Sequence, residues 1–118
     1  MARILLVEDE PLLRELAFED LSDAGFDVTC AKDGDQALAV LQDDRSFDLL
    51  FTDIRMPSDV DGWGLAAEAK RLIPGLRVIY ASGLSDQDNE LGPKDRYLPK
   101  PYRPAALFGL LAELGLEA

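Results

Sequence analysis

The chain has 118 residues, of which 47% are hydrophobic and 30% charged, a composition typical of one folded domain rather than of a disordered segment. Asp and Glu number 23 against 12 Lys and Arg, so the net charge is −11, which argues against binding to nucleic acid or to anionic lipid. The single cysteine excludes an internal disulfide, the apolar runs are too short for a membrane span or a signal peptide, and the absence of histidine removes the commonest general base and metal ligand.

Strand-like and helix-like segments alternate along the chain. Runs of apolar residues predict the strands, and apolar residues at a spacing of three or four predict the helices. In chain order the predicted elements are a strand at 3–8, a helix at 11–25, a strand at 26–30, a helix at 34–44, a strand at 47–52, a helix at 62–73, strands at 76–82 and 96–99, and a helix at 104–116. Such alternation predicts one domain over residues 1–118.

The predicted fold class is α/β, with a doubly wound, five-stranded parallel sheet and helices on both faces. The strand at 47–52 contains the continuous apolar run Leu49, Leu50 and Phe51, as is typical of a strand buried on both faces. The strand at 26–30 instead alternates like a strand near a sheet edge. We expect the flavodoxin-like strand order 2-1-3-4-5. In that order the first and third strands are neighbours at the point where the strand order reverses.

The segment 83–96, GLSDQDNELGPKDR, is poor in apolar residues. Only Leu84 and Leu91 could anchor a helix to the sheet, and Gly92 and Pro93 would end it. We therefore expect a fourth helix in this segment to be short or irregular.

Polar residues lie where the predicted strands end. They are Glu8 and Asp9 after the first strand, Asp53 after the third, Ser82 at the end of the fourth and Lys100 after the fifth. Because the carboxyl ends of parallel strands share one edge of a sheet, we expect these side chains to meet in one crevice.

Three carboxylates in one crevice repel each other, so either some bind protons or a cation binds between them. Oxygen ligands without histidine or cysteine favour Mg²⁺, Mn²⁺ or Ca²⁺. With a cation, the Lys100 ammonium and the Ser82 hydroxyl beside it, the Asp53 carboxylate is equipped to accept a phosphoryl group as a nucleophile. The sequence therefore predicts Asp53 as the site of an aspartyl phosphate.

Four short motifs occur in order at these strand ends: ILLVEDE, TDIRMP, YASG and YLPKP. With them the sequence resembles a response-regulator receiver domain of bacterial two-component signalling, of the stand-alone single-domain type. The resemblance implies that Asp53 is phosphorylated and that Asp9, Asp53 and the backbone carbonyl of Arg55 bind Mg²⁺, or Mn²⁺ in its place. Glu8 would hold the metal through water.

The resemblance also implies the residues that sense the phosphoryl group. Ser82 and Lys100 would contact its oxygens, and Ser82 with Tyr97 would form the switch. We expect the Lys100–Pro101 bond to be cis, since Lys100 must turn back over the strand ends and proline makes a cis bond accessible.

The function implied is a phosphorylation-dependent signalling switch. A phosphohistidine on a histidine kinase or histidine phosphotransfer protein would supply the phosphoryl group, and contacts with an unknown output protein would then change. We expect no separate enzyme activity, although the domain would catalyse its own phosphorylation and slow self-dephosphorylation. We expect no effector segment after residue 118, and therefore a cytoplasmic, stand-alone protein that acts by protein–protein contact, without nucleic acid or membrane partners.

Three alternative functions each require sequence features that differ from those of a phosphorylated receiver domain. A phosphatase of the haloacid-dehalogenase type needs a second acid two residues after its nucleophile, where this chain has Arg55. A flavin-binding module needs a loop rich in Ser, Thr and Gly after the first strand, where this chain has EDEP. The alternative that stays open is a pseudo-receiver, which binds proteins without being phosphorylated.

Overall fold

A parallel sheet of five strands forms the centre of the computed structural model, which describes residues 1–83 and 91–118. The strand order is β2-β1-β3-β4-β5, as predicted. The strands are β1 (Arg3–Val7), β2 (Asp27–Ala31), β3 (Leu49–Asp53), β4 (Arg77–Ser82) and β5 (Asp95–Pro99). The helices are α1 (Pro11–Asp23), α2 (Gly34–Asp43), α3 (Gly62–Leu72) and α4 (Pro104–Glu113).

The predicted strands and the four helices outside segment 83–96 are all present, and their ends differ from the predicted ends by at most three residues. The predicted short or irregular fourth helix falls mainly on residues 84–90, which lie outside the described residues, so α4 is the helix predicted at 104–116. The Lys100–Pro101 bond is cis, as predicted.

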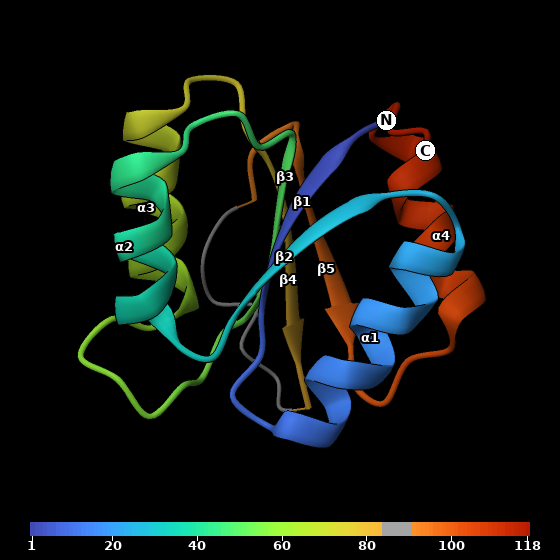
Figure 1. Ribbon diagram of the computed structural model, residues 1–118, viewed down its shortest axis with the longest axis horizontal. Coiled ribbons are helices and arrows are strands. Elements are labelled where there is room, and N and C mark those ends of the chain that lie inside the picture. The colour runs from blue at the N-terminus through green and yellow to red at the C-terminus, as the bar shows by residue number, and fades with distance from the viewer. Residues whose placement is uncertain (84–90) are drawn as a thin grey trace.

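Helices cover both faces of the sheet, with α1 and α4 on one side and α2 and α3 on the other (Figure 1). Each face has its own apolar core. Ile4, Leu21 and Leu107 belong to the core under α1 and α4, and Leu5 and Leu65 belong to the core under α2 and α3. Strand β3 is buried along its whole length, as its apolar run predicted.

Helix α1 packs on the sheet through a narrower face than its apolar residues suggest. Ala17 and Leu21 are buried, whereas the side chains of Leu13 and Leu16 are 43% and 49% exposed. The helical spacing therefore predicted the helix correctly, but two of its apolar residues line a surface groove instead of the core.

The start of α3 fixes the backbone that follows β3. The Gly62 N–H donates to the Ile54 carbonyl at 2.7 Å, and the Asp61 side chain caps the helix by accepting from the Gly64 N–H at 2.8 Å. A Cβ at Gly62 would lie only 2.2 Å from the Asp53 carbonyl oxygen. Glycine at this position allows the helix to lie directly against the end of the strand.

We expect Gly62→Ala to destabilise the fold by about 1–3 kcal/mol, because the added methyl group must displace the backbone of Asp53. Gly109→Ala is the matched control, since a Cβ at Gly109 in α4 meets nothing within 4 Å. That control should be neutral or stabilising by up to about 1 kcal/mol through helix propensity. Urea unfolding of both variants tests this, and equal stabilities would show that the contact at Gly62 does not matter.

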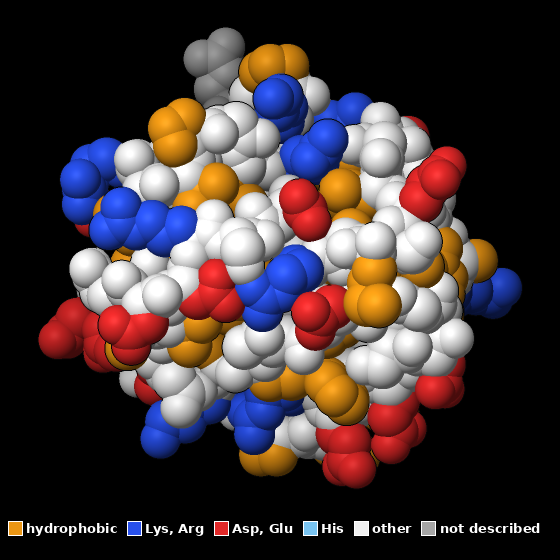
Figure 2. Space-filling model, turned by 45° about the horizontal axis from the view of Figure 1, so that its top comes forward, with side chains coloured by type: hydrophobic (Ala, Val, Ile, Leu, Met, Phe, Trp, Pro, Cys, Tyr) orange, Lys and Arg blue, Asp and Glu red, His pale blue; other side chains and the backbone are white. Residues whose placement is uncertain are grey.

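The strands all run in one direction, from the edge that holds both chain ends to the opposite edge (Figure 1). At the edge where they begin, acidic and basic side chains are interspersed (Figure 2). Arg3 is central there: its guanidinium pairs with Asp27 at 3.0 Å and Asp44 at 2.8 Å and lies 4.6 Å from the centre of the Phe47 ring. Among the residues described, no helix combines the length and apolar character needed to cross a membrane.

Candidate functional site

The polar residues predicted to meet at the carboxyl ends of the strands do so. A cavity of about 200 Å³ lies at this edge of the sheet. Its lining includes six predicted site residues: Glu8, Asp9, Asp53, Arg55, Ser82 and Lys100. The parallel sheet therefore brings together side chains that are up to 92 positions apart in the sequence.

Asp53 is the last residue of β3, and its neighbours hold it firmly. It pairs in register with Ala81 of β4, and the next residue, Ile54, donates its N–H to the Ala81 carbonyl at 3.0 Å. The Thr52 hydroxyl donates to the Asp53 carbonyl at 2.8 Å. Asp53 is only 6% exposed, so its carboxylate needs a neutralising partner.

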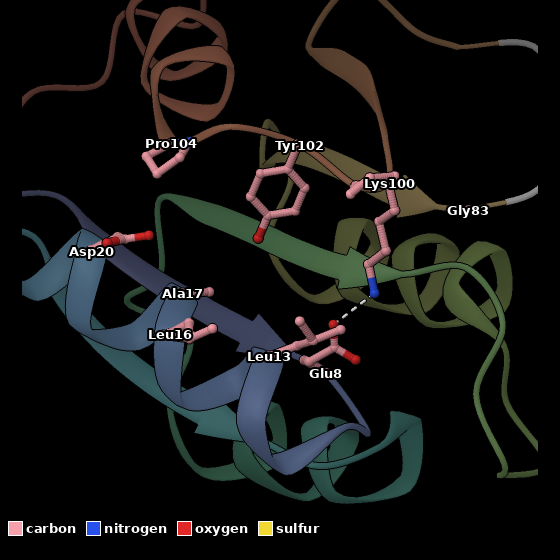
Figure 3. A pocket seen from close by; sticks show the side chains of 10 residues that line it. Glu8, Leu13, Leu16, Ala17, Asp20, Gly83, Lys100, Tyr102 and Pro104 are labelled. Atoms are coloured by element: carbon pink, nitrogen blue, oxygen red, sulfur yellow. Dashed lines mark hydrogen bonds and ion pairs between the residues drawn. The ribbon is translucent and has the colours of Figure 1, made fainter.

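Lys100 supplies that partner. Its ammonium lies 2.5 Å from Asp53 Oδ1 and 2.6 Å from Glu8 Oε1, so one cation bridges two buried carboxylates. Figure 3 shows Lys100 extending from the end of β5 toward Glu8 at the end of β1. The Lys100 N–H donates to the Ser82 carbonyl at 2.8 Å, which fixes the backbone from which the side chain extends.

The third carboxylate, Asp9, lies at the exposed side of this pair. Carboxylate oxygens of Glu8, Asp9 and Asp53 all lie within 4.8 Å of one another. The N-cap of α1 is Glu10, and it makes no side-chain cap bond, so Asp9 does not cap that helix. Three carboxylate oxygens this close together could hold one divalent cation that prefers oxygen ligands.

The buried carboxylates have shifted pKa values. Burial and the hydrogen bond with Glu8 raise the pKa of Asp53 to about 8, against the opposing effect of Lys100. Burial also acts to raise the pKa of Glu8, but hydrogen bonds with Asp53, Lys100 and the Glu10 N–H outweigh it and lower that pKa. Burial acts to lower the pKa of Lys100, but the carboxylates of Asp53 and Glu8 raise it by more than burial lowers it. The net pKa is raised, so Lys100 is charged. Of Glu8 and Asp53, Asp53 is therefore the carboxylate that binds a proton more readily.

The remaining predicted residues border the acidic group. Ser82 ends β4 and is 7% exposed, whereas Arg55 is exposed at the rim of the cavity. Tyr97 does not line the cavity. Its hydroxyl lies 3.5 Å from the Ser82 carbonyl, and its ring packs against the core under α2 and α3.

An apolar groove of about 520 Å³ opens beside the acidic cavity, between α1 and the loop that links β5 to α4 (Figure 3). Leu13, Leu16, Pro101 and Pro104 give it an apolar lining. Glu8, Leu13, Gly83 and Lys100 line both the groove and the acidic cavity, so the two spaces are adjacent.

Tyr102 is a site neighbour that the sequence interpretation missed. It lines the groove and, with Glu8, Asp53 and Lys100, a second cavity of about 10 Å³ behind the carboxylates. Burial raises its pKa to about 12. Its position two residues after Lys100, in YLPKPY, was the available signal, but an aromatic residue after a strand is also typical of plain packing.

The sequence matches the family model described as response regulator receiver domain over residues 4–112. It is 35% identical to the response regulator receiver protein CpdR of Brucella abortus over 122 aligned residues, which cover the full length of both chains. The chain spans about half the length of other curated relatives that it matches. One is the uncharacterized transcriptional regulatory protein YbdJ of Bacillus subtilis, which is 33% identical over 90% of this chain and 47% of that protein.

Solved structures agree with the family model. A response regulator receiver protein from Sinorhizobium medicae has a TM-score of 0.88 and 33% identity, covering 96% of this chain and 93% of that one. The receiver domain of the sensor histidine kinase PA1611 of Pseudomonas aeruginosa, solved with a magnesium ion in its active-site cleft, has a TM-score of 0.81 and 29% identity, covering 98% of both chains.

Proposed function

Because this chain belongs to the response regulator receiver domains of two-component signalling, we propose that it is a phosphorylation-dependent switch with Asp53 as its phosphoacceptor. The observation that supports this best is the bridge from Lys100 to Asp53 and Glu8 inside a three-carboxylate cluster. A fixed ammonium beside a buried, positioned carboxylate is what an incoming phosphoryl group requires. The proposed domain spans residues 1–118.

In the proposed reaction a carboxylate oxygen of Asp53 attacks the phosphorus of a phosphohistidine on a partner protein. The new O–P bond forms as the P–N bond breaks, and the imidazole leaves with the electron pair and binds a proton. Attack requires Asp53 to be ionised, so the proton favoured by burial must first leave. Lys100 and Ser82 then contact the transferred oxygens, and Tyr97 responds to the movement of Ser82.

The donor set fits Mg²⁺, with Mn²⁺ as an alternative. Asp9, Asp53 and the Arg55 carbonyl would hold the ion directly, and Glu8 would hold it through water. When bound, the ion supplies positive charge next to the transferred oxygens. The magnesium-bound receiver domain of PA1611 supports this assignment by similarity.

The proposed phosphodonor is a histidine kinase or histidine phosphotransfer protein. The apolar groove beside α1 lies next to the acidic cavity and offers room for such a donor to contact the domain while its histidine faces Asp53. The phosphorylated form would then bind a different output protein, and the proposed location is the cytoplasm. Self-phosphorylation from small phosphodonors and slow self-dephosphorylation belong to the same proposal.

Incubation with acetyl phosphate and Mg²⁺, followed by intact mass spectrometry, tests the proposal. We expect a gain of one phosphoryl group that disappears when EDTA replaces the metal. A protein that folds and binds Mg²⁺ but never gains mass, even with a phosphorylated histidine phosphotransfer protein as donor, would favour the pseudo-receiver alternative.

Asp9→Asn is expected to weaken Mg²⁺ binding by about tenfold or more, because a neutral amide replaces a charged ligand in a three-carboxylate site. Asp33→Asn is the matched control, since Asp33 is the N-cap of α2 and lies outside the cluster. Titration with Mg²⁺, followed by isothermal calorimetry, measures both affinities. Equal affinities in the two variants would remove Asp9 from the proposed ligand set.

A further inference from the structure

The Tyr102 side chain is fixed by packing against the strand that holds Asp53. Its ring lies 5.9 Å from the ring of Phe51, centre to centre, with the planes at 59°. Phe51 is buried in β3, two residues before Asp53. The hydroxyl extends from this anchored ring toward α1, on the side where Glu8 lies (Figure 3).

The hydroxyl of Tyr102 is an available hydrogen-bond donor. Within residues 1–83 and 91–118 it makes no hydrogen bond. A tyrosine hydroxyl is protonated at neutral pH, and burial raises the pKa of Tyr102 further, to about 12. Tyr102 lines the cavity of about 10 Å³ whose other polar lining residues include Glu8, Asp53 and Lys100. That volume is close to the minimum that holds one water, and the polar lining offers the partners that such a water needs.

Glu8 depends on a partner that phosphorylation would draw away. It is 6% exposed, its Oε1 accepts from the Lys100 ammonium at 2.6 Å, and its Oε2 accepts the Glu10 N–H at 3.2 Å. The same ammonium lies 2.5 Å from Asp53 Oδ1. If Asp53 becomes phosphorylated, the ammonium shifts toward the phosphoryl oxygens. The buried Glu8 carboxylate then has a weaker hydrogen-bond donor and is destabilised.

We propose that the Tyr102 hydroxyl, through one water in the small cavity, replaces Lys100 as the hydrogen-bond donor to Glu8 when Lys100 turns to the phosphoryl group. Tyr102 is then a positioning residue: it acts on Glu8 and touches neither the metal nor the phosphoryl group. The inference rests on the proposed function, because it requires a phosphorylated state in which Lys100 changes partner.

Tyr102→Phe removes the hydroxyl and keeps the ring that packs on Phe51. We expect its melting temperature without Mg²⁺ to equal that of the wild type. With Mg²⁺ present, its affinity for beryllofluoride, a phosphoryl analogue, should fall about three- to tenfold, the size expected for one hydrogen bond. The concentration dependence of the thermal shift measures that affinity. Tyr80→Phe, which removes a hydroxyl from the opposite face of the sheet, should match the wild type in both measurements.

Three outcomes would overturn this role for Tyr102. The first is an affinity of Tyr102→Phe for beryllofluoride equal to that of the wild type, and the second is an equal loss of that affinity in Tyr80→Phe. The third is a melting temperature of Tyr102→Phe that falls as much without metal as with the analogue bound, which would show that Tyr102 acts only by packing. A wild-type protein that binds no analogue and gains no phosphoryl mass would overturn the proposed function itself, and the Tyr102 role with it.

Discussion

Asp53→Asn is expected to abolish phosphoryl uptake from acetyl phosphate in the presence of Mg²⁺, while Asp59→Asn retains it. The amide of asparagine is a poor nucleophile and cannot form the acyl phosphate, although it occupies the same volume at the end of β3. Asp59 lies exposed in the loop after β3 and lines a different surface hollow, so its substitution changes the net charge equally without touching the site.

Intact mass spectrometry over a time course separates these variants. Wild type and Asp59→Asn should gain one phosphoryl group at similar rates, and Asp53→Asn should gain none. A persistent adduct in Asp53→Asn would move the phosphoacceptor to another side chain. Peptide mapping would then identify that residue and contradict the assignment made from the Lys100 bridge.

The stability of the metal-free protein is expected to fall as the pH rises from 5 to 8. The pKa of Asp53 is about 8 in the folded protein, raised mainly by burial, against about 3.8 for an ordinary aspartate. Between these two pKa values the folded state binds a proton at Asp53 that the unfolded state does not bind. Raising the pH makes that proton harder to bind, so the free energy of unfolding falls. The slope can reach about 1.4 kcal/mol per pH unit in this window, and it levels off above pH 8.

Glu8 does not reverse this trend. Its pKa is lowered in the folded state, so the stability that it contributes is complete above its ordinary value of 4.5 and is lost only below that pH. Asp53→Asn should therefore make stability nearly independent of pH between 5 and 8, and near pH 8 it should be more stable than wild type by a few kcal/mol. Asp59→Asn should keep the wild-type slope.

Urea unfolding in EDTA at several pH values measures these slopes. Added Mg²⁺ should flatten the wild-type curve, because the cation competes with the proton for the same carboxylates. A wild-type stability that rises from pH 5 to 8, or an Asp53→Asn variant less stable than wild type at pH 8 without metal, would contradict the proposed protonation of Asp53.

The sequence predicted the elements and the acidic cavity because both depend on strong local signals. The apolar run before Asp53 identified a fully buried strand, and the polar residues at the strand ends had to meet once the sheet was parallel. The contacts that the charged side chains make with one another across the cavity could not be predicted in the same way. That Lys100 contacts Glu8 as well as Asp53 depends on distances within the folded site, which no periodicity specifies.

The burial of apolar residues on the helices could not be predicted from the sequence either. Leu13 and Leu16 share their helical spacing with buried Leu21, yet they line the groove, because the spacing gives a helix face without saying what covers it. Phe108, on the next turn of α4 after Pro104, is half-buried and packs against the core under α1 and α4. Tyr102 was missed because its importance depends on which cavity the residue lines in the folded protein.

The close fit of α3 against the end of β3 has an optical consequence. Trp63, the only tryptophan in the chain, follows Gly62 and stacks on Tyr80, with ring centres 4.3 Å apart and planes at 38°. Tyr80 in turn pairs in register with Thr52, the residue before Asp53. A shift of the carboxyl end of β3 would therefore change the surroundings of the indole, through Tyr80 of β4 and through the first turn of α3. The fluorescence of the native protein can then report what happens at Asp53 without any added label.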